Sequence, residues 1–220
     1  MLPIGDNVKK LDYGWMIWLI IIANILVTYR IFNLPLENFN HFLEKYSLTS
    51  SESLNVFDFL KKAFASTHMH GSYLHLWYNM WFLFVFGVSV ENAIGPFSFA
   101  ALYYGSGIAG WILYYFLTRS DLPAVGSSGA VSGVMAAYLI LFPRAKILSF
   151  WLIFWIVRLI YVPSWIYIGI WAISQVLAMP DKSSGIAYEA HIGGIIFGLL
   201  FGIYYKYLVL QGKDQTQLLT

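Results

Sequence analysis

The chain has 220 residues, of which 59% are hydrophobic, 19% aromatic and only 11% charged, and its mean hydropathy is +0.66. Soluble domains carry about a quarter charged residues, so these values exclude an ordinary soluble protein and indicate a polytopic membrane protein in a lipid bilayer. The formal net charge of +2 is too small to indicate nucleic-acid binding, and the absence of cysteine excludes disulfides and thiolate nucleophiles.

The first apolar segment, residues 15–32, is predicted to be a transmembrane helix. Its apolar run is too long for a secretory signal peptide and has no small-residue cleavage site, so we expect it to remain in the chain. The mixed polar segment that follows, residues 33–67, is too charged to cross a bilayer. No long polar linker interrupts the sequence. We therefore expect one domain over residues 1–220, with a membrane core of about 13–208 and short polar tails at both ends.

The second and third helices are predicted over about residues 74–90 and 97–117. His75 and Asn79 stand early in the second helix, four residues apart and therefore on one helix face. Both side chains can donate hydrogen bonds, which makes this face a candidate for stabilising an oxyanion. A simple bond from Asn79 to a neighbouring helix is the alternative interpretation.

The fourth predicted helix, about residues 128–142, begins within the unusual sequence GSSGAVSG. A serine at a helix N-terminus becomes a nucleophile when a histidine takes its proton, and the N–H groups and dipole of that end suit an oxyanion. We assign Ser128 as the candidate nucleophile and place Gly126 among the groups that stabilise the oxyanion. Ser127 precedes the helix as its expected N-cap, and Ser132 is expected to bond back to a carbonyl one turn earlier.

The apolar stretch 147–179 is too long for one straight crossing and too short for two, at about 20 residues per crossing. Arg158 and Pro163 interrupt it, and a charge at the bilayer centre costs at least about 2.5 kcal/mol. We therefore predict an apolar interfacial loop over 147–162 and a fifth span over about 164–179.

The sixth helix is predicted over about residues 190–207, with His191 at its start. In an all-α bundle of six spans, helices two, four and six run in the same direction. The candidate residues at their N-terminal ends, His75, Ser128 and His191, should then lie near one face of the membrane.

Small residues repeat every four positions on the fourth and sixth helices, and such faces allow helix backbones to approach closely in lipid. Packing alone would explain these repeats. A serine at the start of one repeat and a histidine at the start of the other favour an active site. The repeats are Gly129, Gly133 and Ala137 on the fourth helix and Gly194, Gly198 and Gly202 on the sixth.

Three segments stand in order at the starts of even-numbered helices: HGSYLHLWYNMWFLFVFG, GSSGAVSGVMAAYLILFPRA and AHIGGIIFGLLFG. They resemble the rhomboid intramembrane serine proteases in their six-helix bacterial form, and the resemblance covers nearly the whole chain. It implies that Ser128 is the nucleophile and His191 its general base, with His75 and Asn79 holding the oxyanion. The Trp-Arg pair often found in the first loop of the family is absent from DFLKKAFASTHMHG.

The remaining polar residues near these segments are given structural interpretations. Glu91 resembles an acidic residue that is structural in the family, and His70 matches a family histidine for which we expect a structural bond. No acid completes a triad, because Glu189 precedes His191 by only two residues and Asp121 lies in a loop, so a Ser-His dyad is predicted. We expect no cofactor, and no zinc site among the histidines, because no carboxylate or thiolate completes one.

The sequence therefore predicts an intramembrane serine endopeptidase that cleaves transmembrane segments of membrane proteins. The alternative is a catalytically inactive rhomboid-like adaptor that binds client membrane proteins, although such a protein would typically lack the serine or the histidine. A small-solute transporter is disfavoured, since the sequence has no inverted repeat and no buried charge pair. The resemblance to the six-helix bacterial form implies a bacterial plasma membrane, and the distribution of lysine and arginine favours an active site that opens to the outer side.

Overall fold

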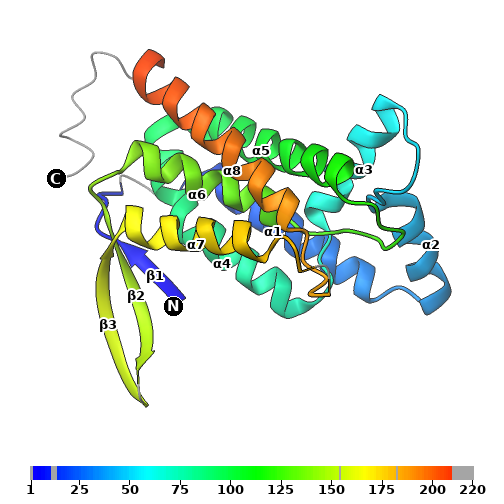
Figure 1. The fold of residues 1–220 in the computed structure, drawn as a ribbon, viewed down its shortest axis with the longest axis horizontal. Helices are drawn as coiled ribbons and strands as arrows, with labels where there is room; N and C mark the ends of the chain where they lie inside the picture. Colours follow the sequence, from blue (N-terminus) through cyan, green and yellow to red (C-terminus); the bar gives the residue numbers. More distant parts are fainter. Residues whose placement is uncertain (1, 11–13, 154, 182, 210–220) are drawn as a thin grey trace.

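The structure is a computed structural model, and it describes residues 2–10, 14–153, 155–181 and 183–209. It is a helical bundle with a small antiparallel sheet at one end (Figure 1). Each of the six predicted helices is present, within a few residues of its expected ends. They are α1 (Trp15–Phe32), α4 (Tyr73–Ile94), α5 (Pro96–Leu117), α6 (Ser128–Leu141), α7 (Ser164–Ala178) and α8 (Tyr188–Tyr204), which a π-helical turn, Tyr205–Val209, continues.

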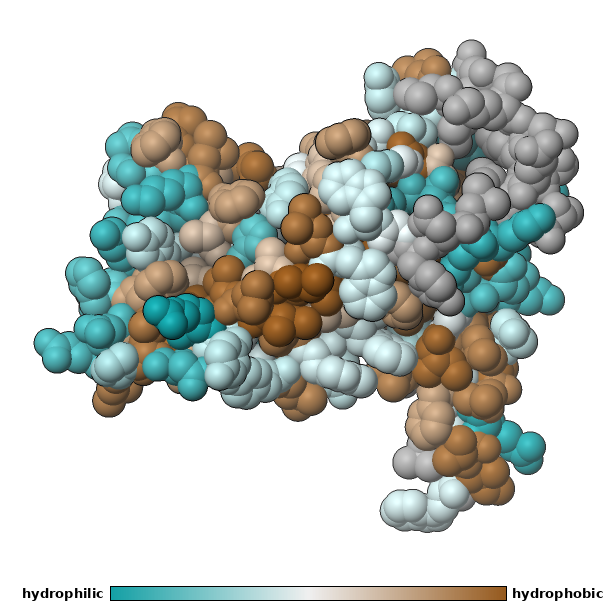
Figure 2. Space-filling view, turned by 180° about the vertical axis from the view of Figure 1, so that it is seen from behind, coloured by the Kyte–Doolittle hydropathy of each residue, from teal (hydrophilic) through white to brown (hydrophobic). Residues whose placement is uncertain are grey.

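The bundle has the length and composition of a membrane protein. Within the described residues, three helical segments are long and apolar enough to cross a bilayer: Trp15–Phe32, Tyr73–Ile94 and Tyr188–Leu208. Helices α6 and α7 are shorter apolar helices. In the view of Figure 2, hydrophobic residues gather in patches near the centre of the molecule and on the projecting hairpin, and hydrophilic residues lie mainly toward its left and right sides. The predicted class, an all-α polytopic membrane protein, is confirmed.

The start of α1 is held by a carboxylate from the end of α4. The backbone N–H groups of Met16 and Ile17 donate to the Glu91 carboxylate, at 3.0 and 2.8 Å. Glu91 thus supplies acceptors for N–H groups that have no partner within the helix. Gly14 precedes them with a φ of 61°, and a side chain there would collide with the Glu91 carboxyl group. The structural interpretation of Glu91 is confirmed.

The polar segment between the first two spans folds into two further helices, α2 (Leu36–Tyr46) and α3 (Val56–His68). They lie at the end of the bundle away from the sheet (Figure 1). The side chain of Asn55 accepts the N–H of Asp58 at 2.9 Å and so caps the N-terminus of α3. These helices were not predicted, because their sequences are too polar to read as spans.

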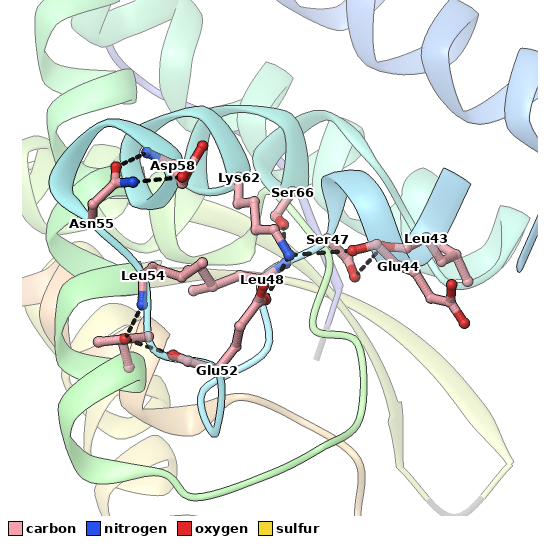
Figure 3. Close-up of polar contacts among 11 residues, drawn as sticks. Leu43, Glu44, Ser47, Leu48, Glu52, Leu54, Asn55, Asp58, Lys62 and Ser66 are labelled. Atoms are coloured by element: carbon pink, nitrogen blue, oxygen red, sulfur yellow. Dashed lines mark hydrogen bonds and ion pairs between the residues drawn. The ribbon is translucent and has the colours of Figure 1, made fainter. Parts of the chain in front are cut away.

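A lysine holds the first loop in place without a Trp-Arg pair (Figure 3). Lys62 on α3 is only 8% exposed. Its ammonium group donates to the carbonyl of Glu44 at 3.2 Å and pairs with the Glu52 carboxylate at 2.6 Å. A buried cation with two oxygen partners has its charge compensated, so Lys62 joins both ends of the loop between α2 and α3.

The predicted interfacial loop is instead a β-hairpin. Strands β2 (Lys146–Ile153) and β3 (Ile156–Pro163) pair in register, and the N-terminal strand β1 (Leu2–Asp6) pairs with β2, giving the order β1-β2-β3. β-branched and aromatic residues dominate both strands of the hairpin and favour a pleated ladder that satisfies the backbone. The described residues of 147–162 contain no helix, and α7 is the one helix that the structure describes between α6 and α8, where a single span was predicted.

Candidate active site

Ser128 and His191 are in direct contact. Ser128 is the first residue of α6, and His191 lies in the first turn of α8. The distance between Ser128 Oγ and His191 Nε2 is 2.8 Å, which is a hydrogen-bond distance. His191 is only 9% exposed, and its ring packs face to face with that of Trp171. A serine hydroxyl and an imidazole in this arrangement can exchange a proton.

The glycine repeats bring the two helices that carry this pair into backbone contact. A side chain at Gly194 would collide with the carbonyl oxygen of Gly129, and one at Gly198 with the carbonyl oxygen of Gly133. We call this line of contacts the glycine seam. Small residues that allow such close approach are typical of helix pairs in membranes. The separation of Ser128 and His191 is therefore set by backbone contact between α6 and α8.

The N-terminal part of α4 completes the cluster. Ser72 caps α4 by accepting the N–H of His75 at 3.0 Å. A Cβ atom at Gly126 would lie 2.8 Å from His75 Cε1 and 3.7 Å from Ser128 Oγ, so His75 and Ser128 flank the same glycine. Asn79, one turn further along α4, is buried, and its Nδ2 has no hydrogen-bond partner among the described residues. An unpaired buried donor is costly and needs an explanation.

Gly126 contributes space. It has a φ of 139°, a conformation that side chains rarely adopt. Its N–H donates to the carbonyl of Ser66 at 2.9 Å, and the Ser66 hydroxyl accepts the N–H of Leu48 at 2.8 Å. The backbone donor of Gly126 is thus engaged in holding the loop, and its missing side chain leaves room beside His75.

The two neighbouring serines have separate roles. The hydroxyl of Ser132 donates to the carbonyl of Ser128 at 2.6 Å, as predicted. Ser127 occupies the N-cap position of α6, as predicted, but its side chain makes no capping bond. Its fully buried hydroxyl lies 3.1 Å from Nε2 of His70 instead.

His70 links three elements beside the site. It lies between α3 and α4, its Nδ1 is 3.1 Å from the Thr28 hydroxyl on α1, and its Nε2 contacts Ser127. Burial lowers the pKa of His70 to about 3, so the ring is neutral at physiological pH. The expected structural bond of His70 is confirmed.

The sequence interpretation missed Gln175. Its Oε1 lies 2.8 Å from Nδ1 of His191, the ring nitrogen that faces away from Ser128. The available signal was an amide inside the apolar span 164–179, sixteen residues before the histidine. Within the described residues, no three His, Cys, Asp or Glu side chains are grouped as a metal site would require.

Comparisons with known proteins define the family. Residues 60–208 match the Rhomboid domain. The chain is 32% identical over 176 residues to Rhomboid protein 1, mitochondrial, of Saccharomyces cerevisiae, covering 74% of this chain and 46% of the relative. It is 26% identical over 157 residues to the human Presenilin-associated rhomboid-like protein, mitochondrial, covering 68% and 39%. It is 37% identical over 71 residues to the Putative rhomboid protease YdcA of Bacillus subtilis, covering 32% and 36%.

The chain therefore belongs to the rhomboid family. It spans less than half the length of these three relatives. The expectation of a bacterial plasma membrane is wrong. Relatives that match two thirds or more of the chain include proteins with mitochondrial names from yeast, mammals and a plant. The expectation followed from the resemblance to the bacterial form, and the shared motifs do not distinguish one membrane from another; positive charges in the loops report only which side of a membrane a loop occupies.

Proposed function

We propose that this chain is an intramembrane serine endopeptidase that cleaves transmembrane segments of other membrane proteins. The observation that carries the proposal is the 2.8 Å contact between Ser128 Oγ and His191 Nε2 at the joined N-terminal ends of α6 and α8. Membership of the rhomboid family supports it. We further propose that residues 1–220 act as one domain, because α1 is tied to the matched region through Glu91.

In the proposed reaction His191 removes the proton of Ser128 as Oγ attacks the carbonyl carbon of a substrate peptide bond. The resulting oxyanion needs donors that are already in place. We assign this role to His75, which lies beside Gly126 as Ser128 does, and to the unpaired Nδ2 of Asn79 one turn further along α4. The first N–H groups of α6, which have no partner within the helix, are further candidates. His191 then returns the proton to the leaving amine.

The adaptor alternative has less support. A protein that only binds clients has no use for a serine hydroxyl in hydrogen-bond contact with a histidine. It also has no use for an amide donor that is buried without a partner. The unpaired amide of Asn79 costs stability, since an unsatisfied buried polar group costs about 1–3 kcal/mol, and a catalytic role gives a reason for it to be retained.

The direct test is cleavage of a membrane-spanning substrate. We expect the purified protein, reconstituted in lipid vesicles, to cut such a substrate and the Ser128→Ala variant to leave it intact. A serine-directed fluorophosphonate should label the wild-type protein and the Ser132→Ala control, with the adduct mapped to Ser128 by mass spectrometry. Equal cleavage by Ser128→Ala, or an adduct on Ser127 or Ser132, would refute the proposal.

The oxyanion donors give a smaller effect. We expect His75→Ala and Asn79→Ala each to lower kcat by about 10²–10³, the usual cost of losing one oxyanion donor. Neither residue activates the nucleophile, so phosphonate labelling of each variant should fall less than its kcat. Steady-state kinetics of each variant measures the change in kcat. An unchanged kcat in both variants would mean that α4 has only a structural role.

A further inference from the structure

We propose that Gln175 is a positioning residue that fixes the protonation pattern of His191 so that Nε2 is a bare acceptor for the Ser128 hydroxyl. The inference rests on the proposed Ser-His chemistry and extends it. None of the described hydrogen bonds of Gln175 goes to the nucleophile. It contacts the opposite nitrogen of the imidazole, through a 2.8 Å separation of Oε1 and Nδ1.

The orientation of the Gln175 amide is determined by its own neighbours. Its NH₂ group lies 3.3 Å from the carbonyl oxygen of Trp171, which can only accept. It also lies 2.9 Å from the hydroxyl of Ser174. That hydroxyl already donates its single proton to the Trp171 carbonyl at 2.6 Å, so toward Gln175 it acts as an acceptor. Because the Trp171 carbonyl and the Ser174 hydroxyl both act as acceptors, the NH₂ group of Gln175 must point toward them. The amide oxygen then faces His191.

The direction of the remaining bonds follows. The side-chain oxygen of Gln175 can only accept a hydrogen bond, so the proton of the neutral imidazole stands on Nδ1. A neutral imidazole carries one ring proton, and Nε2 is consequently free of it. At 2.8 Å from Nε2, the Ser128 hydroxyl donates, which is the arrangement that a general base requires. The chain of donors runs from Ser128 through His191 to Gln175.

An amide differs from a carboxylate in this position. A carboxylate would place a negative charge in an apolar helix interface, and such charges are expensive within membranes. An amide avoids that charge but can present its NH₂ group instead, and the wrong histidine tautomer then costs serine proteases about 10⁴ in kcat. In this chain the Trp171 carbonyl and the Ser174 hydroxyl prevent that reversal. These contacts within α7 therefore explain why an uncharged amide is enough to orient His191 as the third group after the serine and the histidine.

Substitutions at Gln175 separate positioning from packing. Gln175→Leu keeps the bulk and removes the acceptor, and we expect kcat to fall by about 10²-fold or more with little change in KM. Gln175→Glu keeps an acceptor, so cleavage should stay within about tenfold of wild type. Val176→Ala changes an exposed neighbour on the same helix and serves as the matched control, with kcat unchanged.

The pH profile provides a readout that packing would not move. A carboxylate beside Nδ1 stabilises the imidazolium form, so the acid side of the Gln175→Glu rate profile should shift to higher pH. The other ionisable groups around His191 are His75 on α4 and Tyr188 and Glu189 on α8, and these variants leave all three unchanged. An unshifted profile in Gln175→Glu, or wild-type kcat in Gln175→Leu, would overturn the inference.

The inference can fail independently of the proposed function. If wild-type protein does not cleave, or if Ser128→Ala cleaves equally, the protease proposal fails. The role of Gln175 is then decided by nitrogen-15 NMR of the His191 ring. We expect the Nδ1-protonated tautomer in the wild-type protein and a mixture of tautomers in Gln175→Leu. The same tautomer in both proteins would refute the inference whether or not cleavage occurs.

Discussion

Replacing His191 by alanine is expected to abolish cleavage and leave the fold intact. Removing the general base of a serine hydrolase costs about 10⁴-fold or more in kcat, and Ser128 has the His191 ring at hydrogen-bond distance on one side. The substitution does not touch the glycine seam, so α6 and α8 should still pack. Initial cleavage rates in vesicles, together with thermal unfolding of the purified variant, measure the two effects separately.

An exposed histidine provides the control for this experiment. His41 lies on the surface of α2, and His41→Ala should cleave at the wild-type rate. A His191→Ala protein that unfolds at the wild-type temperature and still cuts near the wild-type rate would remove the histidine from the mechanism. The Ser128 assignment would then need another base.

The second large effect is expected from the glycine seam. A Cβ atom at Gly194 would overlap the carbonyl oxygen of Gly129, and a backbone oxygen cannot move aside as a flexible side chain can. Overpacking in protein cores costs about 1–3 kcal/mol, and we expect Gly194→Ala to reach at least the upper end of that range. Because the two helices carry the reacting pair, cleavage should be lost together with stability.

A glycine on another helix makes a matched comparison. Gly169 on α7 has open space around the position of an added Cβ. Gly169→Ala should therefore leave stability unchanged or raise it slightly, since alanine favours a helix by about 0.5–1 kcal/mol over glycine. Reversible unfolding in denaturant compares the two variants. Equal stability of Gly194→Ala and wild type would contradict the close backbone contact.

Much of the fold could be predicted from the sequence. In the described structure each predicted apolar segment of sufficient length corresponds to a helix, because burying backbone groups in lipid leaves few other solutions. The contact between Ser128 and His191 followed from the parallel directions of helices four and six. That argument required only one crossing between residues 147 and 179, and the described part of this range contains one helix, α7.

Other features could not be predicted from the spacing of residue types along the sequence, because they depend on tertiary contacts. The sheet forms because β1, from the start of the chain, pairs with β2 more than 140 residues later, and no local pattern predicts such a pairing. Ser127 turns to His70 because that histidine is buried within reach, a tertiary contact that overrides the local capping preference. Gln175 reaches His191 only because α7 has one particular rotation about its axis.

Ser66 on α3 gives the first loop a mechanical connection to the nucleophile. Its hydroxyl holds the N–H of Leu48, and its carbonyl holds the N–H of Gly126, two residues before Ser128. A β-bridge between Leu48 and Ala124 joins the same two loops directly. The first loop is therefore connected to the segment that leads into α6, two residues before the nucleophile. The glycine seam joins α6 and α8 and holds the serine and the histidine together, so a displacement of the first loop would act on both reacting side chains as one unit.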